Sequence, residues 1–281
     1  MIAVIGASGR TGAALCRVLR AAGRPFIPVV RNAAHWIGTG ITKEAVFADL
    51  EDAKALRAAL EGATVVVNTA HARHAPAVLA AAPEGARFVF LGSTRRFSQW
   101  PDAHGDGVRA GEAAFLASGR AGVMLHPTMI YGATGENNVQ RLAALLKRLP
   151  VAPLPGGGQA LVQPVHQQDL TASILAAIDA PWTGPETLVV AGPEPLPYRD
   201  FLAAVAKAAG LAAPRVVDVP VGLLEKLAPL TRWVPRIPVI GPEEVRRLTE
   251  DKAFPVTAMR ERLGVTGRPL AEGLAQTFSA A

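Results

Sequence analysis

The chain has 281 residues, half of them hydrophobic, so it is long enough to bury a large core and is not intrinsically disordered. Its formal net charge is +6 and its isoelectric point about 10.0, yet the basic residues are scattered without interleaved aromatic side chains. Basic clusters rather than totals mark nucleic-acid surfaces, so we expect no nucleic-acid partner.

The single cysteine, Cys16, excludes an intramolecular disulfide and lies in an apolar stretch typical of a buried thiol. The first expected strand begins at Ile2 and leads into a glycine-rich loop, so no signal peptide is expected. No run of about 18 uncharged apolar residues occurs, so no transmembrane segment is expected. These features predict a cytoplasmic protein.

Strand and helix patterns alternate over the first 132 residues. Apolar strands are expected at 2–5, 26–30, 45–47, 64–68, 88–91 and 123–125. Helices are expected at 11–22, 52–60, 76–82 and 110–117. Alternation of this kind, with continuous apolar strands, predicts a parallel sheet covered on both faces. We therefore predict an α/β fold in which residues 1–132 form a Rossmann-like, doubly wound nucleotide-binding domain.

The pattern changes after residue 132. Helices are expected at 139–149, 169–178 and 198–209, and a strand at 187–190, with a breaker cluster of prolines and glycines at 153–158. Residues 223–230 form a moderately amphipathic stretch, which suits a helix covering its own lobe better than a membrane or partner surface. We predict a smaller C-terminal lobe over residues 133–281.

Three glycines at a spacing of three follow the first strand and open the first helix. Gly6 permits the tight turn, Gly9 lets the backbone approach a pyrophosphate, and Gly12 allows close packing of helix on strand. The helix N-terminus then offers free N–H groups to the phosphates. The loop therefore predicts a dinucleotide site; the alternative is a tight strand–helix turn with no ligand.

Four side chains near this loop refine the prediction. Ser8 and Thr11 can add hydroxyl donors to phosphate. Arg31 ends the second strand, where NAD enzymes place an acidic residue on the ribose, and an arginine there can pair with a 2′-phosphate. With Arg10 projecting toward the same ribose, the two arginines favour NADP(H) over NAD(H). The alternative for Arg31 is an exposed charge at a strand end.

Asp49 and Leu50 follow the third expected strand and have two possible roles. They can bracket the adenine, or Asp49 can cap the following helix.

Several motifs in order support a family resemblance. They are the G-x-x-G-x-x-G loop, Asp49-Leu50, Val65-Val66-Val67-Asn68-Thr69-Ala70, Phe88-Val89-Phe90-Leu91-Gly92-Ser93-Thr94, and His126-Pro127-Thr128-Met129-Ile130-Tyr131-Gly132. Together they resemble the extended and atypical short-chain dehydrogenase/reductase superfamily, including NAD-dependent epimerase/dehydratase-like proteins. The resemblance continues through residues 163–170 and 191–194, so it covers nearly the whole chain.

The resemblance implies positions for further residues. It places Thr69, Ala70 and His71 along the cofactor ribose and phosphates, Ser93 beside the nicotinamide, and Pro127 to Met129 over the nicotinamide ring. It also implies that residues 160–180 return to the nucleotide domain, while the rest of the C-terminal lobe covers the substrate cleft.

The chain lacks the Tyr-x-x-x-Lys pair that supplies the general acid or base in such enzymes. Its two tyrosines, Tyr131 and Tyr198, have no lysine four residues later. In the segment where the pair is expected, His104 aligns near the tyrosine position and Val108 or Arg109 near the lysine position. His104 can shuttle a proton, but a loop histidine among acidic residues is also typical of a solvated side chain. Ser93 and His104 are the candidate catalytic residues.

Other chemistries find little support. No Gly-x-Ser-x-Gly surrounds Ser93, which argues against a hydrolase triad. His71 and His74 have no nearby acidic residue or cysteine to complete a metal site, so no metal is expected. His126 either faces the cleft or packs under it. His166 precedes Gln167-Gln168-Asp169, which can cap the helix that starts there, so a structural role is expected in this region.

Two functions remain open. The first is an NADP(H)-dependent oxidoreductase or epimerase-like enzyme acting on a small-molecule substrate. Phe97, Trp100, Met129 and Ile130 then suit a substrate less polar than a sugar nucleotide, although these side chains can equally be core. The second is a non-catalytic NADP-binding sensor or accessory subunit that docks to a larger complex; a protein partner or a homodimer is compatible with either function.

Overall fold

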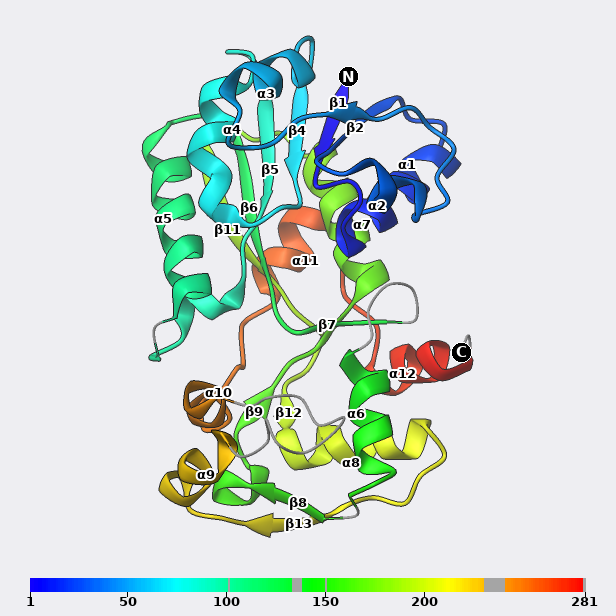
Figure 1. Ribbon diagram of the computed structural model, residues 1–281, viewed down its shortest axis with the longest axis vertical. Helices are drawn as coiled ribbons and strands as arrows, with labels where there is room; N and C mark the ends of the chain where they lie inside the picture. Colours follow the sequence, from blue (N-terminus) through cyan, green and yellow to red (C-terminus); the bar gives the residue numbers. More distant parts are fainter. Residues whose placement is uncertain (101, 133–137, 150, 230–240, 280–281) are drawn as a thin grey trace.

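Seven parallel strands form the central sheet in the order β11-β6-β5-β4-β1-β2-β3 (Figure 1). The computed structural model describes residues 1–100, 102–132, 138–149, 151–229 and 241–279. The strands are β1 (Ile2–Ile5), β2 (Phe26–Val30), β3 (Val46–Phe47), β4 (Val65–Asn68), β5 (Arg87–Leu91), β6 (Gly122–Pro127) and β11 (Pro185–Val190). The predicted Rossmann-like α/β fold is confirmed.

Alternate residues of each strand enter hydrophobic clusters on opposite faces of the sheet. On β4, for example, Val67 joins the cluster that contains Leu19 of α1 and Ile174 of α7, whereas Val66 joins the cluster that contains Phe115 of α5. The covering helices are α1 (Arg10–Ala21), α2 (Ala33–Ile37), α3 (Ala53–Ala59), α4 (Ala75–Ala81), α5 (Ala103–Ala117), α7 (Gln167–Asp179) and α11 (Thr257–Leu263). Two buried faces explain the continuous apolar strands in the sequence. Cys16 is buried in the first cluster, and burial raises the pKa of its thiol to about 12.

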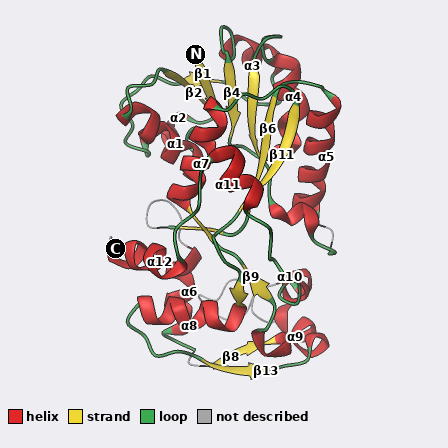
Figure 2. Cartoon of the chain, turned by 180° about the vertical axis from the view of Figure 1, so that it is seen from behind, coloured by secondary structure: helices red, strands yellow, loops and turns green. Residues whose placement is uncertain are grey.

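Three elements from the second half of the chain complete this layered domain. Strand β11 pairs in parallel with β6, α7 packs against α1, and α11 packs against β11 and α7 (Figure 2). An ion pair between Arg24, just after α1, and Asp179, the last residue of α7, links the two halves at 2.7 Å. The nucleotide-binding layer is therefore assembled from distant parts of the sequence.

The smaller lobe lies beyond the carboxyl ends of the sheet strands (Figure 1). Its elements are α6 (Asn138–Leu146), β8 (Val151–Leu154), β9 (Leu161–Val162), β12 (Leu196–Pro197), α8 (Tyr198–Ala208), β13 (Arg215–Asp218), α9 (Val221–Leu227), α10 (Pro242–Arg247) and α12 (Leu270–Ser279). Tyr131, Phe201 and Leu274 are buried together in its core. Strand β7 (Ile130–Tyr131) pairs in parallel with β10 (Val165–His166) where the chain crosses between the two parts.

The amphipathic stretch expected at 223–230 corresponds to α9, and its residue 230 lies outside the described part of the chain. Within the described residues, no helix combines the length and the apolar character that crossing a membrane requires.

Candidate functional site

The glycine loop between β1 and α1 is held in one shape by its backbone. The Gly6 amide donates to the carbonyl oxygen of Val29 at 3.1 Å, and the Gly9 amide donates to that of Gly6 at 2.8 Å. Gly6 has a φ of +73°, which favours glycine. A Cβ at Gly12 would overlap the Gly6 carbonyl oxygen, so this glycine allows the helix to pack on the loop.

Gly9 is different, because the space above it is open. A Cβ there would meet only the Gly6 carbonyl oxygen, at 3.1 Å, within 4 Å. No side chain of the described residues caps α1, and its first turn holds no acidic residue. A helix N-terminus without an acidic side chain in its first turn favours an anionic ligand. This cradle fits the pyrophosphate of a dinucleotide.

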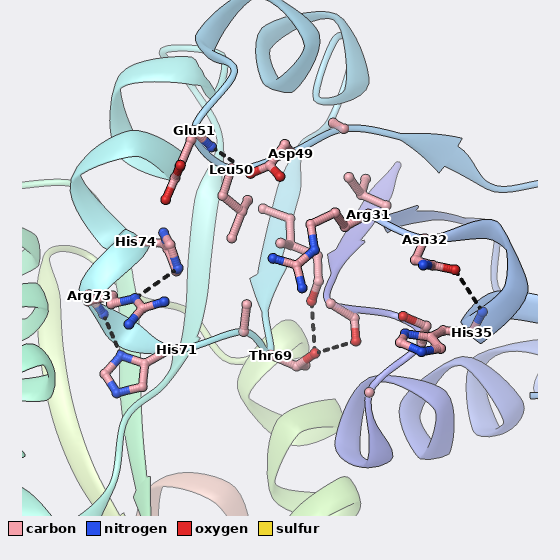
Figure 3. Close-up of a pocket in the computed structure, with 17 residues that line it drawn as sticks. Arg31, Asn32, His35, Asp49, Leu50, Glu51, Thr69, His71, Arg73 and His74 are labelled. Atoms are coloured by element: carbon pink, nitrogen blue, oxygen red, sulfur yellow. Dashed lines mark hydrogen bonds between the residues drawn. The ribbon is translucent and has the colours of Figure 1, made fainter. Parts of the chain in front are cut away.

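A groove of about 410 Å³ runs from this loop along the carboxyl ends of β1, β2, β3 and β4. Figure 3 shows Arg31 reaching into it, with Asn32 and His35 on one side and the segment from Asp49 to Glu51 on another. The groove thus brings together the glycine loop, the end of β2 and the segment after β4, which are the parts predicted to hold a dinucleotide.

Two predicted groove residues already have structural partners. The Thr69 hydroxyl lies 2.8 Å from the carbonyl oxygen of Ile5 and 3.2 Å from that of Gly6, which ties β4 to the loop. The Asp49 carboxylate accepts the Glu51 amide at 3.0 Å, while Asp52 caps α3. Asp49 therefore shapes a turn and does not cap the helix.

A second cavity, of about 1020 Å³, adjoins the groove. Ser8 and Gly9 line the groove, and the next residue, Arg10, lines the cavity. The other lining residues come from both parts of the molecule: Ser93, Thr94, Arg95, Phe97, Ser98, Gln99, Trp100, His104, Thr128, Met129, Asn138, Thr249, Glu250, Asp251, Lys252 and Phe254.

The smaller lobe closes one side of this cavity through specific contacts. The Glu250 carboxylate accepts the Ser98 hydroxyl at 2.9 Å and the Gln99 amide at 2.7 Å. The rings of Phe97 and Phe254 lie 5.5 Å apart, centroid to centroid. Phe97 is still 46% exposed, so its ring also presents apolar surface to the cavity.

A buried charged cluster supports the floor of the cavity. The Ser93 amide donates to Nδ1 of His126 at 3.2 Å, so the proton of this imidazole is on Nε2, 3.2 Å from Oε2 of Glu112. Arg96 pairs with the same carboxylate. Both Glu112 and His126 are buried. His126 therefore packs under the site, and it fixes the position of Ser93.

Comparisons with known proteins agree with this geometry. Residues 6–121 match a protein family described as NAD(P)H-binding. The matched stretch includes the glycine loop and every residue that lines the groove except Ile5. It is 27% identical to a ceramide reductase from Caulobacter vibrioides over 298 residues, covering 99% of this chain and 90% of that protein.

Solved structures show the same fold. An NADPH-dependent quinone oxidoreductase from Escherichia coli, complexed with NADPH, is 18% identical and has a TM-score of 0.76, with 99% of this chain and 100% of that chain covered. A UDP-glucose 4-epimerase from Thermotoga maritima with UDP-glucose is 14% identical, with a TM-score of 0.73 over 99% and 98% of the two chains.

Most predicted site residues line the two spaces of this NAD(P)H-binding protein. Those in the groove are Gly6, Ser8, Gly9, Arg31, Asp49, Leu50, Thr69, Ala70 and His71. Those in the cavity are Arg10, Ser93, His104 and Met129. Among the described residues, Thr11, Gly12 and Pro127 line neither space.

Arg10 and Arg31 line different spaces. Arg31 lines the groove, whereas Arg10, the first residue of α1, lines the cavity. Their convergence on one ribose stays a prediction, and Arg31 is the groove residue predicted to bind a 2′-phosphate.

His104 does not lie in a loop, as the sequence suggested, but in the first turn of α5. Asp102 caps this helix by accepting the Gly105 amide at 2.6 Å. Arg109 donates to the carbonyl oxygen of Arg96 at 2.8 Å and pairs with Asp106, so its guanidinium is held by its own neighbourhood. The position that aligns with the usual lysine thus has a structural role.

His166 has a structural role. It is itself the cap of α7, which begins at Gln167 and not at Asp169, and its Nδ1 accepts the Gln168 amide at 3.3 Å. Burial lowers its pKa to about 4. Within the described residues, no group of three or more metal-binding side chains occurs.

Proposed function

We propose that this protein is an NADP(H)-dependent reductase that converts a ketone-type carbonyl to an alcohol on a molecule with an extended apolar part. The observation that carries the proposal is the second cavity, which adjoins the groove. It contains the predicted nicotinamide contacts Ser93 and Met129, and Phe97 and Trp100 form part of its wall. A cavity of about 1020 Å³ is large enough for a long apolar substrate portion.

The cofactor groove supports a phosphorylated dinucleotide through Arg31. The guanidinium stands at the end of β2, where an acidic residue selects NAD in many relatives of this fold, and it can form charge-assisted bonds to a phosphate. Ser8 and the N-terminal end of α1 would hold the pyrophosphate. When bound, NADPH supplies a hydride to the carbonyl carbon.

The choice between NADPH and NADH tests the role of Arg31. Arg31→Asp should raise the Kd for NADPH by about 10- to 100-fold, because a charge-assisted bond is replaced by repulsion, and should leave the Kd for NADH nearly unchanged. Isothermal titration with both cofactors measures this. Arg148→Asp, the same charge change on an exposed residue of the smaller lobe, is the matched control. Equal weakening of both cofactors by Arg31→Asp would contradict the assignment.

The apolar substrate class has two independent supports. The lining of the cavity combines the aromatic side chains of Phe97 and Trp100 with charged ones such as Arg95, and we assign the apolar part of the substrate to the aromatic side chains. The relative at 27% identity is named a ceramide reductase. The solved structure of a quinone oxidoreductase makes quinones the second substrate class to be tested.

The test is the oxidation of NADPH by the purified protein with three groups of compounds: long-chain β-keto amides, aromatic ketones and quinones. We expect turnover with at least one ketone group, and its loss in Gly9→Val. Tight NADPH binding without turnover on any compound, together with a protein that co-purifies, would favour the accessory-subunit function instead.

A further inference from the structure

Two histidines meet where the groove and the cavity adjoin. Nε2 of His71 lies 3.2 Å from Nδ1 of His104, and their rings are T-shaped, with centroids 4.5 Å apart. His71 lines the groove, whereas His104 lines the cavity. The pair therefore spans the boundary between the predicted cofactor site and the proposed substrate site.

The hydrogen bonds around the pair determine where its protons lie. The backbone amide of Arg73 donates to Nδ1 of His71 at 3.1 Å, so this nitrogen is an acceptor and the proton of His71 is on Nε2. That proton is donated to Nδ1 of His104. The N–H proton of His104 is then on Nε2, the ring nitrogen that does not accept the hydrogen bond from His71.

The surrounding helix is shaped to hold this arrangement. A Cβ at Gly107 would lie 2.8 Å from Cε1 of His71, so a larger residue at this position would displace the ring. The Asp102 cap fixes the first turn of α5, which carries His104, and Arg95 forms an ion pair with Asp102 at 3.2 Å. Both rings are therefore held by contacts from several elements.

Burial, together with the charges nearby, favours the neutral form of both rings. Burial lowers the pKa of His104, and Arg95 lowers it further, against an opposing effect of Asp102. Burial also lowers the pKa of His71, with His104, Arg73 and His74 acting in the same direction. A neutral imidazole with a fixed N–H can serve as an electrophile toward a carbonyl oxygen.

We propose that His104 is the catalytic residue that takes the place of the absent tyrosine, with His71 as its positioning residue. The inference rests on the reductase function proposed above. As the carbonyl carbon gains a hydride, the electron pair of the C=O π bond moves to oxygen. The oxygen takes the proton from Nε2 of His104, which leaves a transient imidazolate whose Nδ1 still accepts the hydrogen bond from His71. Water then returns a proton to Nε2 and is left as hydroxide. One hydride and one solvent proton are consumed for each alcohol formed.

The kinetic test uses a ketone that the wild-type protein reduces. His104→Phe should lower kcat by about 100-fold or more, the effect of losing a positioned proton donor, while the Kd for NADPH changes less than about threefold. His104→Gln retains an N–H donor and should recover part of the loss. Leu116→Ala, at an exposed position of the same helix, is the control and should match the wild type.

A second readout does not depend on turnover. Nitrogen-15 spectra of the histidine rings at pH 7 should show both His71 and His104 neutral with the proton on Nε2. In His71→Phe, His104 should no longer be held in this single tautomer. A His104 proton on Nδ1, or a doubly protonated ring, would overturn the inference. An active wild type with an equally active His104→Phe overturns the inference alone, whereas a wild type inactive on every ketone overturns the reductase function and the inference together.

Discussion

Gly9→Val is expected to raise the Kd for NADPH by more than about 100-fold, or about 2.7 kcal/mol, and to abolish turnover while the protein stays folded. The branched side chain would occupy the open space above the loop, where the pyrophosphate must approach the α1 N-terminus. Because a Cβ at Gly9 meets only one protein atom within 4 Å, the folded state should tolerate the change. Fluorescence titration with NADPH and a thermal melt measure the two effects.

The matched variant is Gly12→Ala, which changes the same loop but is expected to act on the stability of the fold. Its methyl group would overlap the Gly6 carbonyl oxygen and approach the Thr69 hydroxyl at 2.8 Å, so it should lower the free energy of unfolding by about 1–3 kcal/mol. Unchanged NADPH affinity in a folded Gly9→Val protein would show that the loop does not hold the phosphates.

Glu112→Ala is expected to lower the free energy of unfolding by about 3 kcal/mol. The change leaves the buried Nε2–H of His126 and the guanidinium of Arg96 without their carboxylate, and breaking a buried ion pair from one side typically costs about 3–5 kcal/mol. We expect a loss at the lower end of this range of free energies because the Arg96 side chain is 29% exposed. Chemical denaturation of the wild-type and Glu112→Ala proteins measures the difference in their free energies of unfolding.

The control is Glu186→Ala, which removes a carboxylate from an exposed ion pair with Arg262. Exposed pairs contribute about 0–1 kcal/mol, so the change should have little effect on stability. If Glu112→Ala were no more destabilising than Glu186→Ala, the buried cluster would not support the cavity floor as described.

The sequence predicted the fold and the groove well, because both depend on local patterns. A strand, a glycine loop and a helix are consecutive in the chain, so Gly6, Gly9 and Gly12 could be placed from spacing alone. Arg31 could be placed in the groove in the same way, because it directly follows a recognisable strand.

The first part of α5 was missed because glycines obscure it. Gly105, Gly107 and Gly111 have low helix propensity, but each lets the helix approach a neighbouring segment, at Arg95, His71 and Ala72. The Asp102 cap was the available signal for the true start of the helix.

The pairing of His71 with His104 could not be found from one sequence. The two residues are 33 positions apart, and their contact depends on the packing of α5 against the segment after β4. The same holds for Glu250 and Phe254, which reach the cavity from near the end of the chain. Local periodicity carries no information on such contacts.

The most direct test of the proposed reductase function is deuterium transfer from NADPH labelled at nicotinamide C4. Mass spectrometry of the products from the ketones described above follows the label. The proposal predicts deuterium on the new alcohol carbon with the wild-type protein, and none with Gly9→Val. Saturable NADPH binding with no deuterium in any product would contradict it.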